Sequence, residues 1–140
     1  PPLAGAHGLG LRVHPWAAAT AGLSAPLVVA TTPAGGTDRL VPAVAPAPGV
    51  LLDVLYQPWP TPLAAAWAAH GGVVVGGLEL LVQQAVLQVR RWTGREVEAG
   101  VLRAAGEAAR AAAGEAAQAA AERRTVSGPA DAGPPDGRCG

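Results

Sequence analysis

The chain has 140 residues, a formal net charge of zero, and hydrophobic side chains at half of its positions. This length suits one domain of ordinary size, and the balanced charge favours neither nucleic acid nor an anionic membrane as a partner, so we expect neither. Proline and glutamate interrupt the apolar runs before any reaches the roughly 18 to 20 residues that span a bilayer.

The first quarter of the chain predicts one buried strand. Residues 1–10 are rich in Gly, Pro and Ala and show no period, so we expect an irregular start. Residues 11–14 alternate and predict a short strand, and residues 17–23 predict one or two helical turns. Residues 27–30 are a continuous apolar run that stops at the Thr/Pro/Gly segment 31–36. That pattern is typical of a buried parallel strand followed by a loop.

Three further elements follow. Residues 50–56 predict a second buried strand. Thr61 and Pro62 suit the N-cap and first position of a helix, which we expect to end at His70 before a Gly pair. Residues 73–75 predict a third short strand.

The remaining chain is predicted to be helical and then disordered. A clear helical pattern covers residues 78–93, Gly94 stops it, and another helix begins near residue 97. An Ala/Glu/Arg-rich segment at 107–124 predicts a solvated helical extension. Residues 125–140 are rich in Gly, Pro and Asp, and we expect them to be disordered.

Strands that alternate with helices indicate an α/β fold with a parallel sheet. Such sheets bind ligands at the carboxyl ends of their strands. Three loops are predicted to meet there: residues 31–36, 56–60 and 76–77. We therefore expect the functional site in these loops.

The 78–93 helix has one apolar face, which we expect to pack on the sheet. At 100° per residue this face carries Leu78, Val82, Ala85, Val89 and Trp92. Gln84 and Gln88 lie one turn apart on its flank, whereas Gln83 points the opposite way toward Glu79. An amide bordered by leucines suits the hydroxyl groups of a ligand, although a glutamine with a purely structural role is the commoner case.

Other polar residues have structural explanations. Tyr56, the only tyrosine, is a ligand candidate or a core residue with a satisfied hydroxyl. Asp53 lies inside an apolar strand, so we expect it to bind loop backbone or an arginine. His14 and His70 lack companions at metal-ligand spacing, so no metal site is predicted. Cys139 is the only cysteine, so no disulfide can form within the chain, which suits a reducing, cytoplasmic location.

Three motifs follow one another along the chain. They are Val29-Ala30-Thr31-Thr32-Pro33-Ala34-Gly35, then Asp53-Val54-Leu55-Tyr56-Gln57-Pro58-Trp59-Pro60-Thr61-Pro62-Leu63, and last Gly76-Gly77-Leu78-Glu79-Leu80-Leu81-Val82-Gln83-Gln84-Ala85 with Trp92-Thr93-Gly94. In this order and spacing they resemble the C-terminal half of shikimate dehydrogenase. The resemblance covers about half of the chain closely and extends loosely to residues 11 and 106. It implies the C-terminal part of a Rossmann-like parallel sheet with covering helices, an Ala-rich C-terminal helix, and NADP as cofactor.

The resemblance implies a role for six residues. Tyr56 and Gln84 match positions that bind the substrate, shikimate or 3-dehydroshikimate. The positions that line the nicotinamide end of NADP are matched by Thr32, Val54, Gly77 and Leu80. This chain departs from the family pattern at Ala30, where Asn is usual, at Val54, where Met is frequent, and at Glu79, an uncommon charge.

The resemblance also implies that essential parts lie elsewhere. All ten basic residues are arginine, and a guanidinium cannot exchange a proton as the family's catalytic lysine does. No glycine-rich pyrophosphate turn occurs either. We therefore expect a C-terminal fragment, inactive alone, of an enzyme that reduces 3-dehydroshikimate with NADP in aromatic amino acid biosynthesis, and an N-terminal domain or partner chain that completes it. The absence of Met at position 1 predicts a natural start further upstream.

The expected organisation is an irregular start at 1–10, the dinucleotide-binding part with its closing helices at 11–106, the extension at 107–124 and the tail at 125–140. Three alternatives remain open: a non-catalytic half-Rossmann binding module that pairs with another chain, a quinate-using relative, and a structural protein built on the Ala-rich helix. The last is disfavoured because that helix lacks a heptad of large apolar residues.

Overall fold

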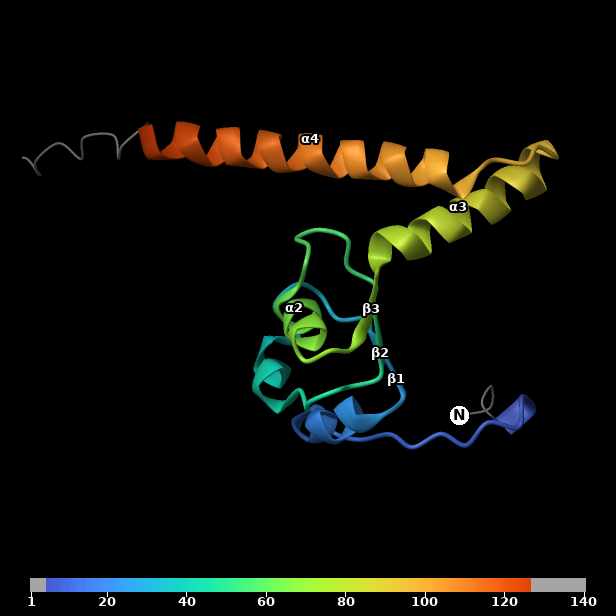
Figure 1. The fold of residues 1–140 in the computed structure, drawn as a ribbon, viewed down its shortest axis with the longest axis vertical. Coiled ribbons are helices and arrows are strands. Elements are labelled where there is room, and N and C mark those ends of the chain that lie inside the picture. The colour runs from blue at the N-terminus through green and yellow to red at the C-terminus, as the bar shows by residue number, and fades with distance from the viewer. Residues whose placement is uncertain (1–4, 127–140) are drawn as a thin grey trace, which may run out of the picture.

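The computed structural model describes residues 5–126, and Figure 1 shows an α/β body from which two helices lead away. In chain order the elements are η1 (Trp16–Ser24), β1 (Leu27–Ala30), η2 (Asp38–Ala43), β2 (Val50–Asp53), α2 (Pro62–Ala69), β3 (Val73–Gly76), α3 (Gly77–Thr93) and α4 (Ala99–Val126), where η marks a 3-10 helix. Of the expected tail at 125–140, all but the first two residues lie outside the described part, and those two end α4.

The sheet is parallel, and its strands lie in the order β1-β2-β3. Leu27 pairs with Val50, which in turn pairs with Val73, and the register continues to Ala30, Asp53 and Gly76. Each strand is a four-residue run that is almost entirely apolar, as expected of strands in a parallel sheet. The predicted α/β class with a Rossmann-like parallel sheet is confirmed.

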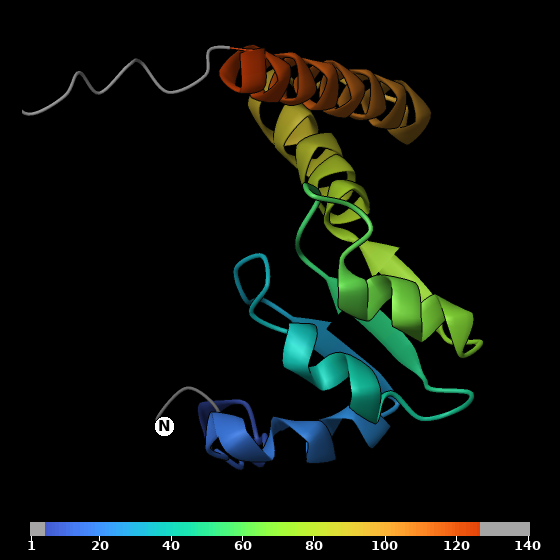
Figure 2. The ribbon, with the colours of Figure 1, turned by 90° about the vertical axis from the view of Figure 1, so that its left-hand side faces the viewer.

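The core lies on one side of this sheet. Leu51, Leu63 and Trp67 are its largest fully buried side chains. The Trp67 indole N–H donates to the carbonyl oxygen of Gly49 at 3.0 Å, so α2 is fixed against the loop that leads into β2. Figures 1 and 2 show η1, η2 and α2 all on this side of the strands.

Helix α3 does not cover the sheet, which corrects the expectation from its apolar face. It continues from the end of β3, leads away from the body and packs against α4. Leu78 meets α4 where Gly106 passes, since a Cβ on Gly106 would lie 2.6 Å from Leu78 Cδ1. Val82 is buried, whereas Trp92 at the far end is 79% exposed. The apolar face of α3 therefore packs in part against a second helix and not on the sheet.

Three smaller expectations also need correction. Residues 11–14 form no strand and are exposed, because no strand of the described sheet lies beside them. The second strand ends at Asp53 rather than residue 56. No loop separates β3 from α3, because Gly77 is already the first residue of the helix.

The other predicted elements are present. Thr61 is the N-cap of α2, and its hydroxyl accepts a hydrogen bond from the N–H of Ala64 at 3.1 Å. Helix α3 ends at Gly94, which adopts the left-handed conformation (φ 69°) typical of a glycine that stops a helix. Helix η2, which contains Pro42, was not predicted.

Candidate functional site

The carboxyl ends of the three strands are bound to one another by main-chain hydrogen bonds. The N–H of Val54 donates to the carbonyl of Ala30 at 3.0 Å, and the N–H of Gly77 donates to the carbonyl of Leu55 at 3.1 Å. The residues that follow β1, β2 and β3 therefore meet at the carboxyl end of the sheet, where the sequence predicted the ligand-binding loops.

A buried carboxylate holds the loop after β2. Asp53 is 2% exposed; its Oδ2 accepts from the Thr61 hydroxyl at 2.7 Å and its Oδ1 from the N–H of Leu55 at 3.1 Å. This confirms the expectation that Asp53 binds loop backbone. It also explains why β2 ends there, since a carboxylate that bonds the N–H two residues ahead turns the chain out of the strand.

The position of Gly77 is explained by main-chain packing. A Cβ there would lie 2.0 Å from the carbonyl oxygen of Val54 and 2.5 Å from its carbonyl carbon. Only glycine permits this approach, so two of the cofactor candidates, Val54 and Gly77, are in direct contact. Leu80, half-buried, lies one turn further along α3.

Thr32 lies at the end of a groove that follows β1. A Cβ on Gly36 would lie 2.9 Å from the Thr32 Cβ, so the turn at 33–36 packs against this threonine. The groove has a volume of about 340 Å³, and it is bordered by residues of η1, β1, η2 and α2. Thr32 is the only one of the six candidate residues in its lining.

Tyr56 is 48% exposed, and its side chain extends from the loop after β2. Three residues further along the chain, Trp59 covers the end of β3, since a Cβ on Gly76 would lie 2.8 Å from the Trp59 ring. Trp59 was not among the candidate residues predicted from the sequence. Its position between two prolines in the second motif was the available signal.

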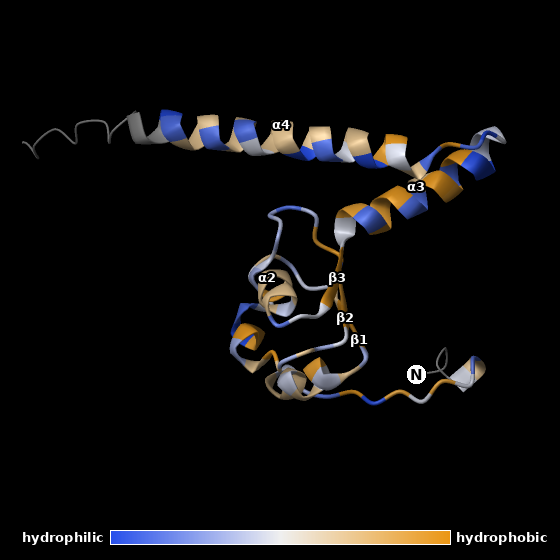
Figure 3. Ribbon diagram, in the orientation of Figure 1, coloured by the Kyte–Doolittle hydropathy of each residue, from blue (hydrophilic) through white to orange (hydrophobic). Residues whose placement is uncertain are grey.

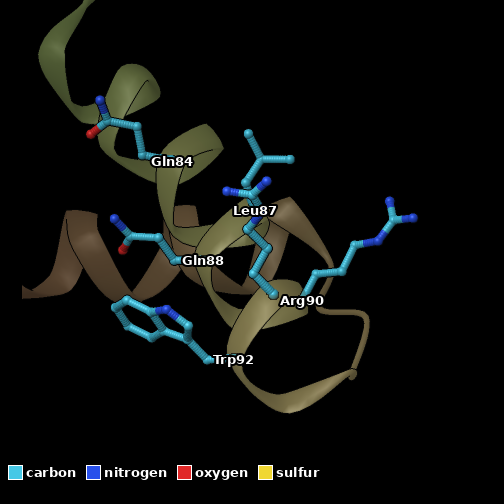
Figure 4. A pocket seen from close by; sticks show the side chains of 6 residues that line it. Gln84, Leu87, Gln88, Arg90 and Trp92 are labelled. Carbon is cyan, nitrogen blue, oxygen red and sulfur yellow. The ribbon is translucent and has the colours of Figure 1, made fainter.

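Gln84 is exposed on α3 and borders an open hollow of about 900 Å³. In Figure 4, Gln84, Gln88 and Trp92 follow one another along the same side of the helix. The lining consists of Gln84, Leu87, Gln88, Arg90, Arg91 and Trp92, all from α3. The hollow thus includes Gln88, to which the resemblance gives no role, but no residue of the strand-end loops.

Glu79 is held by a network between α3 and α4. Its carboxylate accepts from Gln83 at 2.8 Å and from two nitrogens of Arg103 at 2.9 Å each. The hydrogen bond from Gln83, followed by those from Arg103 and the charge of Arg103, lowers the pKa of Glu79 below its usual 4.5. The uncommon charge at this position is thereby explained as a link between the two helices.

Residues 5–126 contain no group of three or more His, Cys, Asp or Glu side chains that could hold a metal ion. Over the same residues no helix has both the length and the apolar character needed to cross a membrane.

Comparison with known proteins gives a consistent result. The family model described as "Shikimate 5'-dehydrogenase C-terminal domain" matches residues 77–105. The "Shikimate dehydrogenase (NADP(+))" of Acidiphilium cryptum is 40% identical over 94 residues, which are 64% of this chain and 34% of that protein. The one from Mesorhizobium japonicum is 39% identical over 92 residues, 62% of this chain and 33% of that protein.

Two solved structures share the fold. A shikimate 5-dehydrogenase from Mycobacterium fortuitum matches 74% of this chain and 40% of its own, with a TM-score of 0.60 and 37% identity. Shikimate dehydrogenase of Mycobacterium tuberculosis matches 64% of this chain and 34% of its own, with a TM-score of 0.56 and 38% identity. This chain thus spans between a third and two fifths of the length of these four relatives, and what it is similar to is the C-terminal region of shikimate dehydrogenases.

Proposed function

We propose that this chain supplies the cofactor side of the cleft in a shikimate dehydrogenase that interconverts 3-dehydroshikimate and shikimate with NADP. One observation carries the proposal: the three matched motifs follow three adjacent parallel strands, and hydrogen bonds from Val54 and Gly77 hold the strand ends together. Parallel α/β sheets bind their ligands at the carboxyl ends of their strands.

The residues at the carboxyl ends of the strands fit the nicotinamide end of NADP. Thr32, Val54, Gly77 and Leu80 are proposed to line the nicotinamide, a flat ring that half-buried apolar side chains such as Val54 and Leu80 suit. NADP, when bound, exchanges a hydride with the C3 carbon of the substrate. The described residues offer no glycine-rich turn for the pyrophosphate, so that part of the cofactor is assigned to a region outside this chain.

Two side chains are proposed to bind the substrate. The amide of Gln84 both donates and accepts, which suits a hydroxyl group, and the exposed phenol of Tyr56 offers a second partner from the loop after β2. Their task is to align the C3 carbon with the nicotinamide. No catalytic residue is assigned here, because the chain has no lysine to exchange the proton.

The proposal therefore requires a second polypeptide region, either a domain of the same protein or a partner chain. That region supplies the proton-exchanging residue and the pyrophosphate turn, and the chain is proposed to be inactive without it. A cytoplasmic location is part of the same proposal, since a chain with a single cysteine suits a reducing compartment.

The test is reconstitution. The part of the Mycobacterium fortuitum enzyme that precedes its match to this chain is co-expressed with the chain, and NADPH formation from shikimate is followed by absorbance. We expect activity from the pair and none from either part alone. A lack of NADPH, with the relative's own C-terminal region active in the same assay, would contradict the proposal.

Two substitutions on α3 test whether Gln84 binds the substrate. Gln84→Ala should lower kcat/KM by about 5- to 150-fold, because leaving a substrate hydroxyl without its hydrogen-bond partner costs roughly 1 to 3 kcal/mol. Gln88→Ala, one turn away on the same side of α3, should change it less than twofold. Equal effects of the two substitutions would remove Gln84 from the substrate site. Quinate in place of shikimate tests the quinate-using alternative.

A non-catalytic binding module is the second candidate. The observation that favours it is the incomplete cover of the sheet, since side chains on its other face stay exposed. A pair that assembles without producing NADPH would support this candidate.

A further inference from the structure

The two candidate substrate residues, Tyr56 and Gln84, are joined through the start of α3. Leu55, the neighbour of Tyr56, accepts the N–H of Gly77 at 3.1 Å, so both residues extend from one base. Gln84 lies about 10 Å along the helix from Gly77, at 1.5 Å per residue. A turn of α3 by about 10° at this base would therefore move Gln84 by about 2 Å. A misplacement of about 1 Å can slow a reaction by about 100-fold, so the direction of α3 matters for the substrate site.

The main chain fixes where α3 begins but not its direction. Gly76 and Gly77 form the junction between β3 and α3, and no side chain caps the helix there. Glycine restricts backbone rotation least of all residues. Helix α4 turns with α3, because the ion pair between Glu79 and Arg103, at 2.8 Å, ties the two helices to each other. A side chain of the α/β body is therefore needed to hold this pair of helices in one direction.

Trp59 lies at this junction. Its side chain is half-buried and packs against the core of the body. A Cβ on Gly76 would lie 2.8 Å from both Cη2 and Cζ2 of the ring, so the ring rests directly on the end of β3. Pro58 and Pro60 flank Trp59, and the fixed φ of proline makes this part of the loop stiff. The ring is thus a firm support for the start of α3.

The same ring faces α4. A hollow of about 190 Å³ lies between Trp59, the first turn of α3 and α4. A second hollow, of about 490 Å³, lies between residues 57–59 and residues 107–114 of α4. Figures 1 and 2 show the loop after β2 extending toward the two helices. From residue 103 to 125, α4 has no large apolar side chain, and Figure 3 shows strong hydrophobic colour only at its first turn. Trp59 therefore supplies the large apolar surface between this part of α4 and the body.

We propose that Trp59 is a positioning residue of the substrate site: its ring, held between the end of β3 and α4, sets the direction of α3 and thereby the separation of Tyr56 and Gln84. Trp59 acts through Gln84, without contact to the reacting atoms. The matched family model ends at residue 105, so residues 107–114, which border Trp59, lie beyond it. The effect on the substrate rests on the proposed function, whereas the direction of α3 does not.

The direction of α3 is measured as a distance between two spin labels. Ala65 on α2 and Gln88 on α3 are both exposed, so Ala65→Cys and Gln88→Cys, combined with Cys139→Ser, place one label on the body and one on the helix. Double electron–electron resonance on the full chain should give one narrow distribution of distances. Trp59→Ala should broaden the distribution by about twofold or more, because α3 loses its support. Trp59→Phe, which keeps an aromatic ring at the junction, should broaden it less.

Gly76→Ala changes the junction while it keeps Trp59. Because the new Cβ would lie 2.8 Å from a ring on a stiff loop, the end of β3 must give way. The most probable distance should shift by about 2 Å, the effect of a turn of about 10°. Val44→Ala is the control, since Val44 is a buried core residue that lines neither hollow. It should lower stability and leave the distribution unchanged.

The distribution of distances decides the structural part of the proposal. A distribution that Trp59→Ala leaves narrow, or that Val44→Ala broadens equally, overturns it. Circular dichroism shows whether Trp59→Ala folds. If it does not fold, Gly76→Ala decides, and an unmoved distance then overturns the proposal.

The effect on the reaction is measured in the reconstituted pair. Trp59→Ala should raise the KM for shikimate by about fivefold or more, because Gln84 is displaced. The KM for NADP should change less than about twofold, because three of the four residues proposed to line the nicotinamide lie at or before the base of α3. A purely structural role would lower kcat with the folded fraction and leave both KM values unchanged, and that result overturns the proposal.

A double-mutant cycle tests whether Trp59 acts through Gln84. Trp59→Ala should lower kcat/KM for shikimate by about fivefold or more in the original chain, but by less than about twofold in Gln84→Ala, where the positioned hydrogen bond is already lost. Additive effects of the two substitutions overturn the proposal. A distribution of distances that broadens with Trp59→Ala, in a chain that forms no NADPH with any partner, overturns the proposed activity alone.

Discussion

At the scale of single residues, Asp53 and Thr61 decide how the loop that bears Tyr56 is held. The Thr61 hydroxyl donates to the buried Asp53 carboxylate and accepts from the first turn of α2, so one side chain links strand, loop and helix. Removing the hydroxyl leaves a buried carboxylate oxygen without its partner and α2 without its cap.

We expect Thr61→Ala to lower the free energy of unfolding by about 2 kcal/mol, whereas Thr61→Ser, which retains the hydroxyl, should cost less than about 1 kcal/mol. Urea unfolding followed by circular dichroism measures both. Equal losses for the two variants would show that the methyl group, not the hydrogen bonds, matters at this position.

Gly77 provides a second residue-scale prediction. Because a Cβ there would collide with the main chain of Val54, which cannot move without breaking the sheet, Gly77→Ala should destabilise the chain by roughly 1 to 3 kcal/mol. A Cβ on Gly114 in α4 would have nothing within 4 Å, so Gly114→Ala should instead raise helicity and stability by about 0.5 to 1 kcal/mol. Unfolding midpoints that move in the same direction for both variants would contradict this account.

At the scale of elements, the sequence predicted each strand and helix of the body except η2, because short apolar runs and Thr/Pro or Gly boundaries are local signals. The prediction that α3 packs on the sheet was wrong. An apolar face shows that a helix packs against another element, but it does not show which element that is. Leu78 packs where Gly106 passes, a contact that depends on the turn between α3 and α4. The strand predicted at 11–14 failed because alternation over four residues provides no pairing partner.

The candidate site was also predictable only in part. The strand-end loops were predicted from topology, and the Val54–Gly77 contact follows from it. Gln84, in contrast, lies in a hollow formed by α3 alone. Its relation to Tyr56 depends on the direction in which α3 leaves the sheet, and no local pattern in the sequence encodes that direction.

The link between α3 and α4 should depend on pH. Hydrogen bonds lower the pKa of Glu79 in the folded chain relative to the unfolded chain, so its contribution to stability is fully present above the unfolded pKa, near 4.5. It is lost as the pH falls through the lower, folded pKa. The stability difference between the original chain and Glu79→Gln should therefore be present at pH 6 to 7 and shrink below about pH 4.5.

Glu115 on the exposed part of α4 is the matched control, and Glu115→Gln should show no such pH dependence. Because Glu79 and Arg103 are partly exposed, the difference should also shrink in high salt. A pH-independent difference for Glu79→Gln would mean that its side chain acts by packing alone.

At the scale of the whole molecule, the body has half of the cover that its sheet requires. Only Leu51, Leu63 and Trp67 are fully buried large side chains among the described residues, all on one face. A partner that binds the folded chain but not the unfolded chain must stabilise the folded state by mass action, by about 2.7 kcal/mol when its free concentration is 100 times its dissociation constant.

We therefore expect the unfolding midpoint to rise with the concentration of the preceding region of the Mycobacterium fortuitum enzyme. Val29→Pro should abolish the rise, because proline blocks the outer edge of β1, which has β2 as its only strand neighbour in the described sheet. Gln84→Ala should leave the rise intact, because Gln84 lies on α3, beyond the end of the strands. A rise that disappears with Gln84→Ala and persists with Val29→Pro would place the contact on α3 instead.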